Sequence, residues 1–362
     1  MIPLFKVAMA QGATTNVGHV LRSGYIGQGA KVDEFEKVLQ RELSVTDREI
    51  LTVNSGTSAL DLALHLAGVR PGDEVISTAQ TCTATNTVIV NRHAHIVWAD
   101  VDPLTGNIDV ADVKKKLSRK TRAIMAVDWG GRPCDYHALS DCGVPVIEDA
   151  AHSYLATHEG IHIADGPADY VCWSFQAIKH LTTGDGGAIR TPKYSSERAR
   201  LLRWYGLDRR SKQSFRCEQI IEETGYKYHM NDIAAAIGLS NIDVASDNVF
   251  NHRTNARLYH KLLHGARGVK LPPPEEGSAW WLYTLLVDDR ASFTEHMTKW
   301  AIEVSPVHAR NDRHPSLRGY GAPLPGLDYF SEHEVAIPVG WWLSREDMDR
   351  VAEAVHSWRG GK

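Results

Sequence analysis

Three short segments of the chain combine residue types that can do chemistry. The first is residues 54–58, which read NSGTS. Glycine and small hydroxyl residues let backbone N–H groups approach an anion closely, and the start of a helix adds a favourable dipole. We therefore expect this turn, between a strand and a helix, to be able to hold a phosphate. The alternative is an ordinary helix N-cap, a position that serine and threonine also favour.

The second segment ends an apolar strand and reads IEDAAH at residues 147–152. Ligands of open parallel sheets collect at the C-terminal ends of the strands. The carboxylate of Asp149 could stay ionised there by pairing with a cationic ligand atom, and His152 could reach the same ligand. The alternative is a solvated acidic residue that caps the next helix.

The third segment reads SFQAIK at residues 174–179 and precedes the glycine-rich run TTGDGG at 182–187. A lysine that follows a buried strand can be desolvated, which lowers its pKa and frees its amine as a nucleophile. A lone lysine is more often a surface charge. Taken together, the amine, the carboxylate and the phosphate turn are the parts that a pyridoxal phosphate site needs. The lysine would form the Schiff base, and the carboxylate would hold the pyridine nitrogen protonated.

Composition narrows the classes of protein that could carry these segments. The chain has 362 residues, a formal charge of −4 and 43% hydrophobic residues, which is typical of a globular protein of about two domains. It has no concentrated basic stripe, so we expect no nucleic-acid partner. No apolar run is long enough for a membrane span and no signal peptide is evident, so we expect a cytoplasmic protein without a membrane partner. The five cysteines include no C-x-x-C pair and the histidines no H-E-x-x-H, so we expect no metal site.

The hydrophobic pattern predicts the elements that must position the three segments. Short apolar runs alternate with helical patterns between about residues 50 and 190, which predicts an α/β fold with a mainly parallel sheet. We expect strands at 74–77, 95–99, 123–127, 145–148, 170–175 and 187–190, and helices at 57–67, 109–117, 231–248, 251–263, 291–300 and 344–358. We therefore expect a large cofactor-binding domain with an N-terminal arm, residues 1–248, and a smaller C-terminal α/β domain, residues 249–362.

Further motifs give the chain a specific resemblance. It resembles the DegT/DnrJ/EryC1/StrS family of pyridoxal-phosphate-dependent sugar aminotransferases, which share the aspartate-aminotransferase fold, also called PLP fold type I. The likeness covers almost the whole chain, and its motifs follow in order: SGYIGQG at 23–29, NSGTSAL at 54–60, DVDP at 100–103, EDAAH at 148–152, SFQAIK at 174–179, GYKYHM at 225–230, AAIGL at 235–239 and IP at 337–338.

The resemblance implies roles for individual residues. Lys179 would form the Schiff base and then carry the proton between the cofactor and the substrate carbon. Asp149 would pair with the pyridine nitrogen of pyridoxal 5′-phosphate. The phosphate would be bound by the backbone N–H groups of Gly56 and Thr57 and by the hydroxyl of Ser174.

Several positions depart from the family pattern. His152 stands where many members have glutamine, near the phenolic oxygen of the cofactor. Lys227 replaces an asparagine in a loop that reaches the neighbouring subunit's cofactor phosphate, so we expect a contact in trans within a homodimer that shares its active sites. Cys82 occupies a usual aromatic position, so ring stacking must come from elsewhere or be weaker. Asp128 replaces a histidine, which puts a substrate contact in doubt.

The segment 307–314 aligns loosely with a His-Tyr-x-x-Pro-x-His segment of the family and keeps both histidines six apart. We expect His308, Arg310 and His314 to bind substrate there, with the arginine facing a nucleotide diphosphate. The alternative is a structural loop bonded to the large domain.

The resemblance implies transfer of an amino group from an amino acid, with L-glutamate as the expected donor, to a nucleotide-linked keto-deoxysugar. One alternative is a sugar dehydratase of the same family, although those enzymes typically carry histidine where this chain has Lys179. Another is a non-catalytic member that binds a nucleotide sugar, which the complete set of Lys179, Asp149 and Ser174 argues against.

Overall fold

A mixed, mostly parallel sheet forms the centre of the molecule. The structure, a computed structural model, describes residues 1–43, 45–211, 216–321 and 323–360. The strands of the main sheet lie in the order β1-β9-β8-β5-β4-β2-β3-β12, and β9 runs antiparallel to both of its neighbours. Their bounds are β1 Arg48–Val53, β2 Glu74–Thr78, β3 His95–Ala99, β4 Thr121–Val127, β5 Val146–Asp149, β8 Tyr170–Ser174, β9 Gly187–Pro192 and β12 Gly319–Tyr320.

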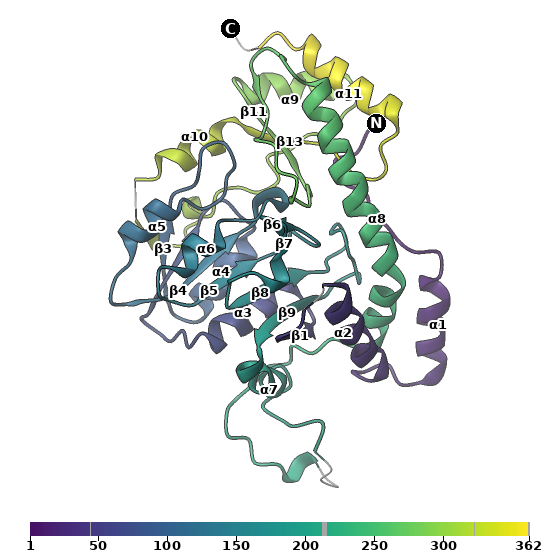
Figure 1. Cartoon of the computed structure of the whole chain (residues 1–362), viewed down its shortest axis with the longest axis vertical. Helices are drawn as coiled ribbons and strands as arrows, with labels where there is room; N and C mark the ends of the chain where they lie inside the picture. Colours follow the sequence, from purple (N-terminus) through teal and green to yellow (C-terminus); the bar gives the residue numbers. More distant parts are fainter. Residues whose placement is uncertain (44, 212–215, 322, 361–362) are drawn as a thin grey trace.

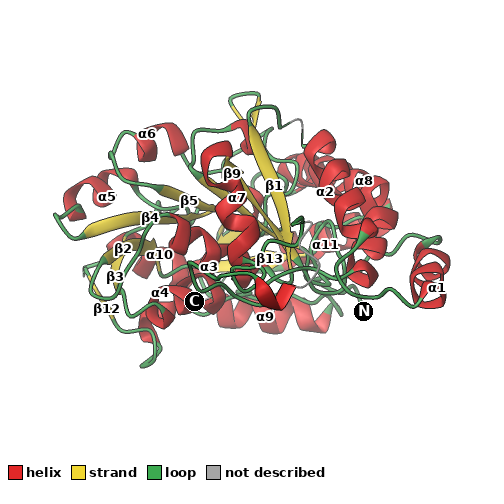
Figure 2. Cartoon of the chain, turned by 90° about the horizontal axis from the view of Figure 1, so that it is seen from below, coloured by secondary structure: helices red, strands yellow, loops and turns green. Residues whose placement is uncertain are grey.

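Helices cover both faces of this sheet. Figure 2 shows α5 and α6 on one face and α3 and α4 on the other. The helices are α1 Ala13–Ser23, α2 Ala30–Glu42, α3 Gly56–Leu66, α4 Thr83–Asn91, α5 Val110–Lys116, α6 Tyr136–Ser140, α7 Lys193–Leu202, α8 Asp232–Leu262, α9 Arg290–Lys299, α10 Pro325–His333 and α11 Arg345–Ser357, with 3₁₀ turns at Trp129–Gly131, Ile163–Asp165, Arg216–Glu218 and Asn311–Arg313. The predicted α/β class with a mainly parallel sheet is confirmed.

One predicted break is wrong, because α8 runs without interruption through residues 249–250. The expected helix ended at Asn248, and asparagine is a poor helix former. Its side chain is instead buried and donates to the carbonyl of His180 (3.2 Å), while the Nδ1 of His252 bonds to the carbonyl of Asn248 (2.7 Å). Tertiary packing therefore overrides the local preference. Figure 1 shows α8 running from α1 and α2 at one end to α9 and α11 at the other.

A second sheet lies beyond α8. Strands β10 (Val269–Lys270), β11 (Tyr283–Val287) and β13 (Glu334–Ile337) pair antiparallel, and their buried residues pack with α9 and α11 in a hydrophobic cluster of their own. A short hairpin pairs β6 (Thr157–His158) with β7 (Ile161–His162). The proposed domain boundary at residue 248 falls inside α8 and stays a prediction. In the described part of the chain, no helix combines the length and apolar character needed to cross a membrane.

Candidate active site

Strands β5 and β8 bring two of the predicted segments together. They pair in parallel, with Asp149 opposite Cys172, so their C-terminal ends lie at the same edge of the sheet. Asp149 is the last residue of β5, and Ser174 is the last residue of β8. Lys179 follows in the turn after β8, where its backbone N–H donates to the carbonyl of Gln176 (2.9 Å). The sequence-predicted amine and carboxylate therefore share one edge of the sheet.

Asp149 is a buried carboxylate with few hydrogen bonds. Its Oδ2 accepts from the hydroxyl of Thr85 (2.7 Å), and its Oδ1 accepts from the N–H of Ala151 (3.1 Å). Burial raises the pKa of Asp149, whereas these two hydrogen bonds and the charge of Lys179 lower it. A cationic ligand atom placed beside this carboxylate would favour its ionised form.

Lys179 lies in an environment that favours its neutral amine. Its Nζ sits 3.7 Å from the ring centroid of Trp281. Burial lowers the pKa of Lys179 to about 8, against the opposing charges of Asp149 and Cys82, which raise it. An amine with this pKa is partly unprotonated near neutral pH, as a nucleophile requires.

Aromatic rings surround this lysine. The ring of His152 stacks on that of Trp281, with centroids 4.0 Å apart, and lies nearly parallel to the ring of His308 at 5.8 Å. Trp129 meets both histidines edge-on. Burial lowers the pKa of His152, and burial lowers that of His308 to about 4, so both rings are neutral at pH 7. The buried His152 Nδ1 and His308 Nε2 have no partner among the described residues.

The NSGTS turn begins α3. The Ser55 hydroxyl accepts from the N–H of Ser58 (3.1 Å), so the N-cap interpretation is correct for Ser55. The cap does not occupy the N–H groups of Gly56 and Thr57, which have no intrahelical acceptor at this position. A Cβ on Gly56 would lie 2.9 Å from the Cβ of Ser174. Only glycine lets the start of α3 approach the end of β8 so closely. This approach places the groups expected to bind the phosphate, on Gly56, Thr57 and Ser174, side by side.

Lys227 lies on a segment that is fixed next to this turn. Its carbonyl accepts from the side chain of Asn54 (3.1 Å), and its exposed side chain sits between two tyrosines in sequence. The rings of Tyr226 and Tyr228 stack 4.6 Å apart, and the Tyr228 hydroxyl donates to Asp61 (2.9 Å). A cavity of about 440 Å³ is lined by these tyrosines and by residues of the turn, including Thr57 and Ser58.

The three predicted substrate residues of the segment 307–314 lie in different surroundings. His308 faces His152, as described above. Arg310 instead binds two carboxylates, those of Asp312 (2.7 and 2.8 Å) and Asp328 (2.5 Å), which raise its pKa. His314 follows the 3₁₀ turn and donates its backbone N–H to the carbonyl of Asn311 (3.0 Å). Substrate binding by these three residues stays a prediction.

Some residues of the site carried no usable signal in the sequence. Thr85 holds Asp149, and Trp281 contacts Lys179 from the loop before β11, more than a hundred positions later. Asn311 is buried and donates to the carbonyl of Thr81 (2.7 Å), which ties the 307–314 segment to the large domain. Asp128, where the family pattern has a histidine, is fully buried.

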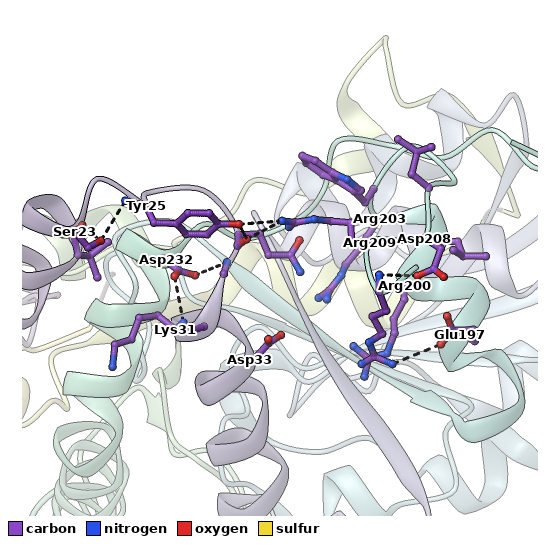
Figure 3. A pocket seen from close by; sticks show the side chains of 18 of the residues that line it. Ser23, Tyr25, Lys31, Asp33, Glu197, Arg200, Arg203, Asp208, Arg209 and Asp232 are labelled. Carbon is purple, nitrogen blue, oxygen red and sulfur yellow. Dashed lines mark hydrogen bonds and ion pairs between the residues drawn. The ribbon is translucent and has the colours of Figure 1, made fainter. Parts of the chain in front are cut away.

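A separate cavity of about 690 Å³ lies between α1, the start of α2 and the end of α7 (Figure 3). The carboxylate of Asp232 accepts from the backbone N–H groups of Gly29 (2.7 Å) and Lys31 (3.2 Å) and so caps α2. Arg209 donates to the carbonyl of Gln28 (2.9 Å). The described lining includes none of the predicted cofactor or substrate residues, so this cavity is distinct from the site around Lys179.

The residues around Lys179 fit pyridoxal phosphate. Gly56 leaves space against Ser174, Asp149 is a buried carboxylate, and the Nδ1 of His152 is a buried polar atom without a described partner. When bound, the cofactor would supply an electron sink and carry the amino group. Asp149 would hold a proton on its pyridine nitrogen, and Lys179 would hold its aldehyde carbon.

Comparisons with known proteins agree with this chemistry. The model of the DegT/DnrJ/EryC1/StrS aminotransferase family matches residues 8–356. The crystal structure of AtS13 from Actinomadura melliaura is 39% identical, with a TM-score of 0.94 over 99% of this chain and 98% of that one. The sugar aminotransferase CalS13 from Micromonospora echinospora is 37% identical, with a TM-score of 0.93 over 99% of this chain and all of that one.

A third structure bears on the cofactor. The putative sugar aminotransferase Spr1654 from Streptococcus pneumoniae, solved in PLP and PMP forms, is 25% identical, with a TM-score of 0.90 over 98% of this chain and at least 97% of that one. These matches confirm PLP fold type I. The chain therefore belongs to the DegT/DnrJ/EryC1/StrS aminotransferase family and is a sugar aminotransferase that depends on pyridoxal phosphate.

Proposed function

We propose that the enzyme moves an amino group from L-glutamate to the keto carbon of a nucleotide-linked deoxysugar. The observation that carries this proposal is the pairing at one sheet edge of Lys179, whose pKa is about 8, with the buried Asp149. The resemblance to nucleotide-sugar aminotransferases supports the acceptor class. The buried His152 Nδ1 and His308 Nε2 are polar atoms that a sugar hydroxyl or keto oxygen can bond.

Each residue has one task in this proposal. Lys179 would hold the cofactor until the donor amine displaces the lysine, and its free amine would then carry a proton from the donor carbon to the cofactor. With the acceptor bound, the same amine returns a proton to the sugar carbon. Asp149 stays ionised throughout, because the proton on the pyridine nitrogen faces it. Gly56, Thr57 and Ser174 hold the phosphate and so fix the cofactor's position.

We also propose a homodimer with shared active sites. The exposed side chain of Lys227 sits on a segment held by the Tyr226 and Tyr228 rings, which pack against α3 of the same chain. Side chains alternate along an extended segment, so the lysine faces away from the two tyrosines. This arrangement suits a cation that is offered to the cofactor phosphate of a neighbouring subunit.

Two half-reactions test the proposed donor and acceptor. The protein loaded with pyridoxal phosphate is mixed with L-glutamate, and the cofactor's visible absorbance should fall as 2-oxoglutarate appears. A nucleotide-linked keto sugar should then restore the absorbance, whereas the same sugar without its nucleotide should restore it slowly. The Lys179→Ala variant is the control and should do neither. Equal rates with and without the nucleotide would overturn the acceptor proposal. If L-glutamate causes no fall in absorbance, the donor proposal is overturned.

A further inference from the structure

Two carboxyl groups lie in contact behind the active site. Glu148 precedes Asp149 on β5, so its side chain points to the opposite face of the sheet. Glu148 lies opposite Ala126 on β4, and Asp128, two residues after Ala126, points to the same face, where the two carboxyl groups interact. Both residues are completely buried. Water therefore cannot screen one carboxyl group from the other.

The two groups differ in the hydrogen bonds that they receive. Asp128 accepts three: from the N–H of Cys134 (3.0 Å), the hydroxyl of Tyr136 (2.8 Å) and the hydroxyl of Ser153 (2.6 Å). The two carboxyl oxygens of Glu148 receive none from the residues that the structure describes. Hydrogen bonds to an ionised carboxylate stabilise its charge, so Asp128 is the better place for a negative charge.

Two buried carboxylates in contact cannot both stay ionised, because their repulsion adds to the cost of burying each charge. The titratable groups that act on this pair from the described part of the chain are Asp149, Cys134, Tyr136 and Cys172, and none of them is a cation. Burial raises the pKa of Asp128 to about 6, and burial together with the charge of Asp128 raises that of Glu148 well above its usual range. One proton is therefore shared by the pair.

We propose that Glu148 is a neutral carboxylic acid whose O–H donates to Asp128, and that it acts as a positioning residue for the active site. Asp128 accepts from Ser153, whose N–H bonds to the carbonyl of Ala150 (3.1 Å), so Asp128 fixes the turn that carries His152. The backbone N–H of Asp128 donates to the carbonyl of Asp149 (3.3 Å). Through Asp128, Glu148 thus helps to fix the backbone carbonyl of Asp149 and the turn that follows Asp149.

The neutrality of Glu148 also has an electrostatic consequence. An ionised Glu148 would add a second negative charge next to Asp149 and make its ionised form less stable. A neutral Glu148 leaves Asp128 as the only charge of the pair. This consequence rests on the proposed pairing of Asp149 with the pyridine nitrogen, whereas the protonation state of Glu148 does not.

Infrared difference spectroscopy tests the protonation state on the apoprotein at pH 8. An un-ionised carboxylic acid absorbs above the amide I band, and its C=O band shifts in D₂O. We expect the Glu148→Gln variant to lose such a band. Glu334→Gln is the matched control, because Glu334 is a buried glutamate on β13 and its loss should leave the Glu148 band in place. No change of this band in Glu148→Gln would overturn the proposal.

Cofactor binding tests the positioning role without measuring catalysis. Glutamine keeps a donor toward Asp128, whereas leucine has a similar size and no donor. In fluorescence titrations of the apoproteins, we expect Glu148→Gln to bind pyridoxal phosphate like the wild type and Glu148→Leu to bind it about tenfold more weakly. Equal affinities of the two variants would show that the hydrogen bond is not needed. Neither readout depends on the sugar or the amino donor, so failure of the proposed function would be seen separately.

Discussion

The amine of Lys179 lies over the indole ring of Trp281, with Nζ 3.7 Å from the ring centroid. This contact has two opposing effects on the lysine. The ring excludes water, which favours the neutral amine, while the electron-rich face of the ring stabilises the ammonium. Burial of the site as a whole lowers the pKa of Lys179 to about 8.

The lowered pKa of Lys179 predicts when the apoprotein combines with pyridoxal phosphate. The neutral amine is the reactive form, so the rate of combination should rise as the pH passes 8 and level off near pH 9. An exposed lysine would keep gaining reactivity up to about pH 10.4. Stopped-flow absorbance at limiting pyridoxal phosphate measures this profile, and Lys179→Ala gives the background. A rate that still rises tenfold per pH unit at pH 9.5 would contradict the lowered pKa.

The same shift predicts a change in stability. The unfolded chain binds a proton at Lys179 up to about pH 10.4, whereas the folded chain releases it near pH 8. Folding of the apoprotein is therefore opposed by this group below pH 8, and stability should rise between pH 8 and about pH 10.4. Lys179→Met should remove this rise. Urea unfolding at several pH values measures the difference, and parallel curves for the two proteins would rule the effect out.

The cation–π contact of Trp281 with Lys179 can be tested separately from the exclusion of water by its ring. In Trp281→Leu the site stays apolar but loses the cation–π contact, so the pKa of Lys179 should fall by about half a unit to one unit. Trp281→Phe keeps an aromatic face and should stay closer to the wild type. The pH dependence of Lys179 modification by cyanate in the apoproteins, read by mass spectrometry, measures each value. A rise of the pKa in Trp281→Leu would mean that the ring acts mainly by excluding water.

The hydrogen bond from Thr85 to Asp149 should affect the pH below which the protein loses its affinity for pyridoxal phosphate. The Thr85 hydroxyl donates to Asp149 at 2.7 Å and lowers the pKa of that carboxylate. Thr85→Val keeps the shape but removes the donor, so the pKa of Asp149 should rise by about one unit. The loss of pyridoxal phosphate affinity as the pH falls should then begin at a higher pH. Thr85→Ser should behave like the wild type in the same titration, and coincident curves for valine and serine would refute the role.

Gly56 should be intolerant of the smallest side chain. The added Cβ of Gly56→Ala would sit 2.9 Å from the Cβ of Ser174 and push the phosphate turn away from β8. We expect pyridoxal phosphate affinity to fall by an order of magnitude or more. Gly12→Ala is the matched control, because Gly12 has ordinary backbone angles and open space around its Cβ position. Equilibrium dialysis compares the two, and a normal affinity in Gly56→Ala would place the phosphate elsewhere.

The sequence could predict those parts of the site that local physics determines. Asp149 and Ser174 end apolar strands, and Ser55 to Thr57 start a helix, so each is legible from its neighbours. Trp281 and Thr85 were not, because their roles depend on which distant elements the fold brings beside Lys179 and Asp149. The continuity of α8 was missed for the same reason, since a distant carbonyl accepts the Asn248 hydrogen bond.

Arg310 has carboxylate partners that the sequence analysis did not consider. Its partner Asp312 lies two positions later, so an ion pair within the segment was legible from the sequence. We instead expected this arginine to face an anionic ligand, with a structural loop as the alternative. A diphosphate would have to compete with two carboxylates for this guanidinium.

The shared active site can be tested by mixing two inactive variants. Lys179→Ala lacks the catalytic amine, and Lys227→Ala lacks the cation that we propose to act in the neighbouring subunit. If Lys227 acts in trans, half of the co-expressed dimers are mixed, and each has one site with both lesions and one intact site. Activity should then recover to about a quarter of the wild type. If Lys227 acts within its own chain, both sites of every mixed dimer are damaged and no activity above that of the parent variants returns. The assay therefore distinguishes the two arrangements by gain of function, which misfolding of either variant cannot imitate.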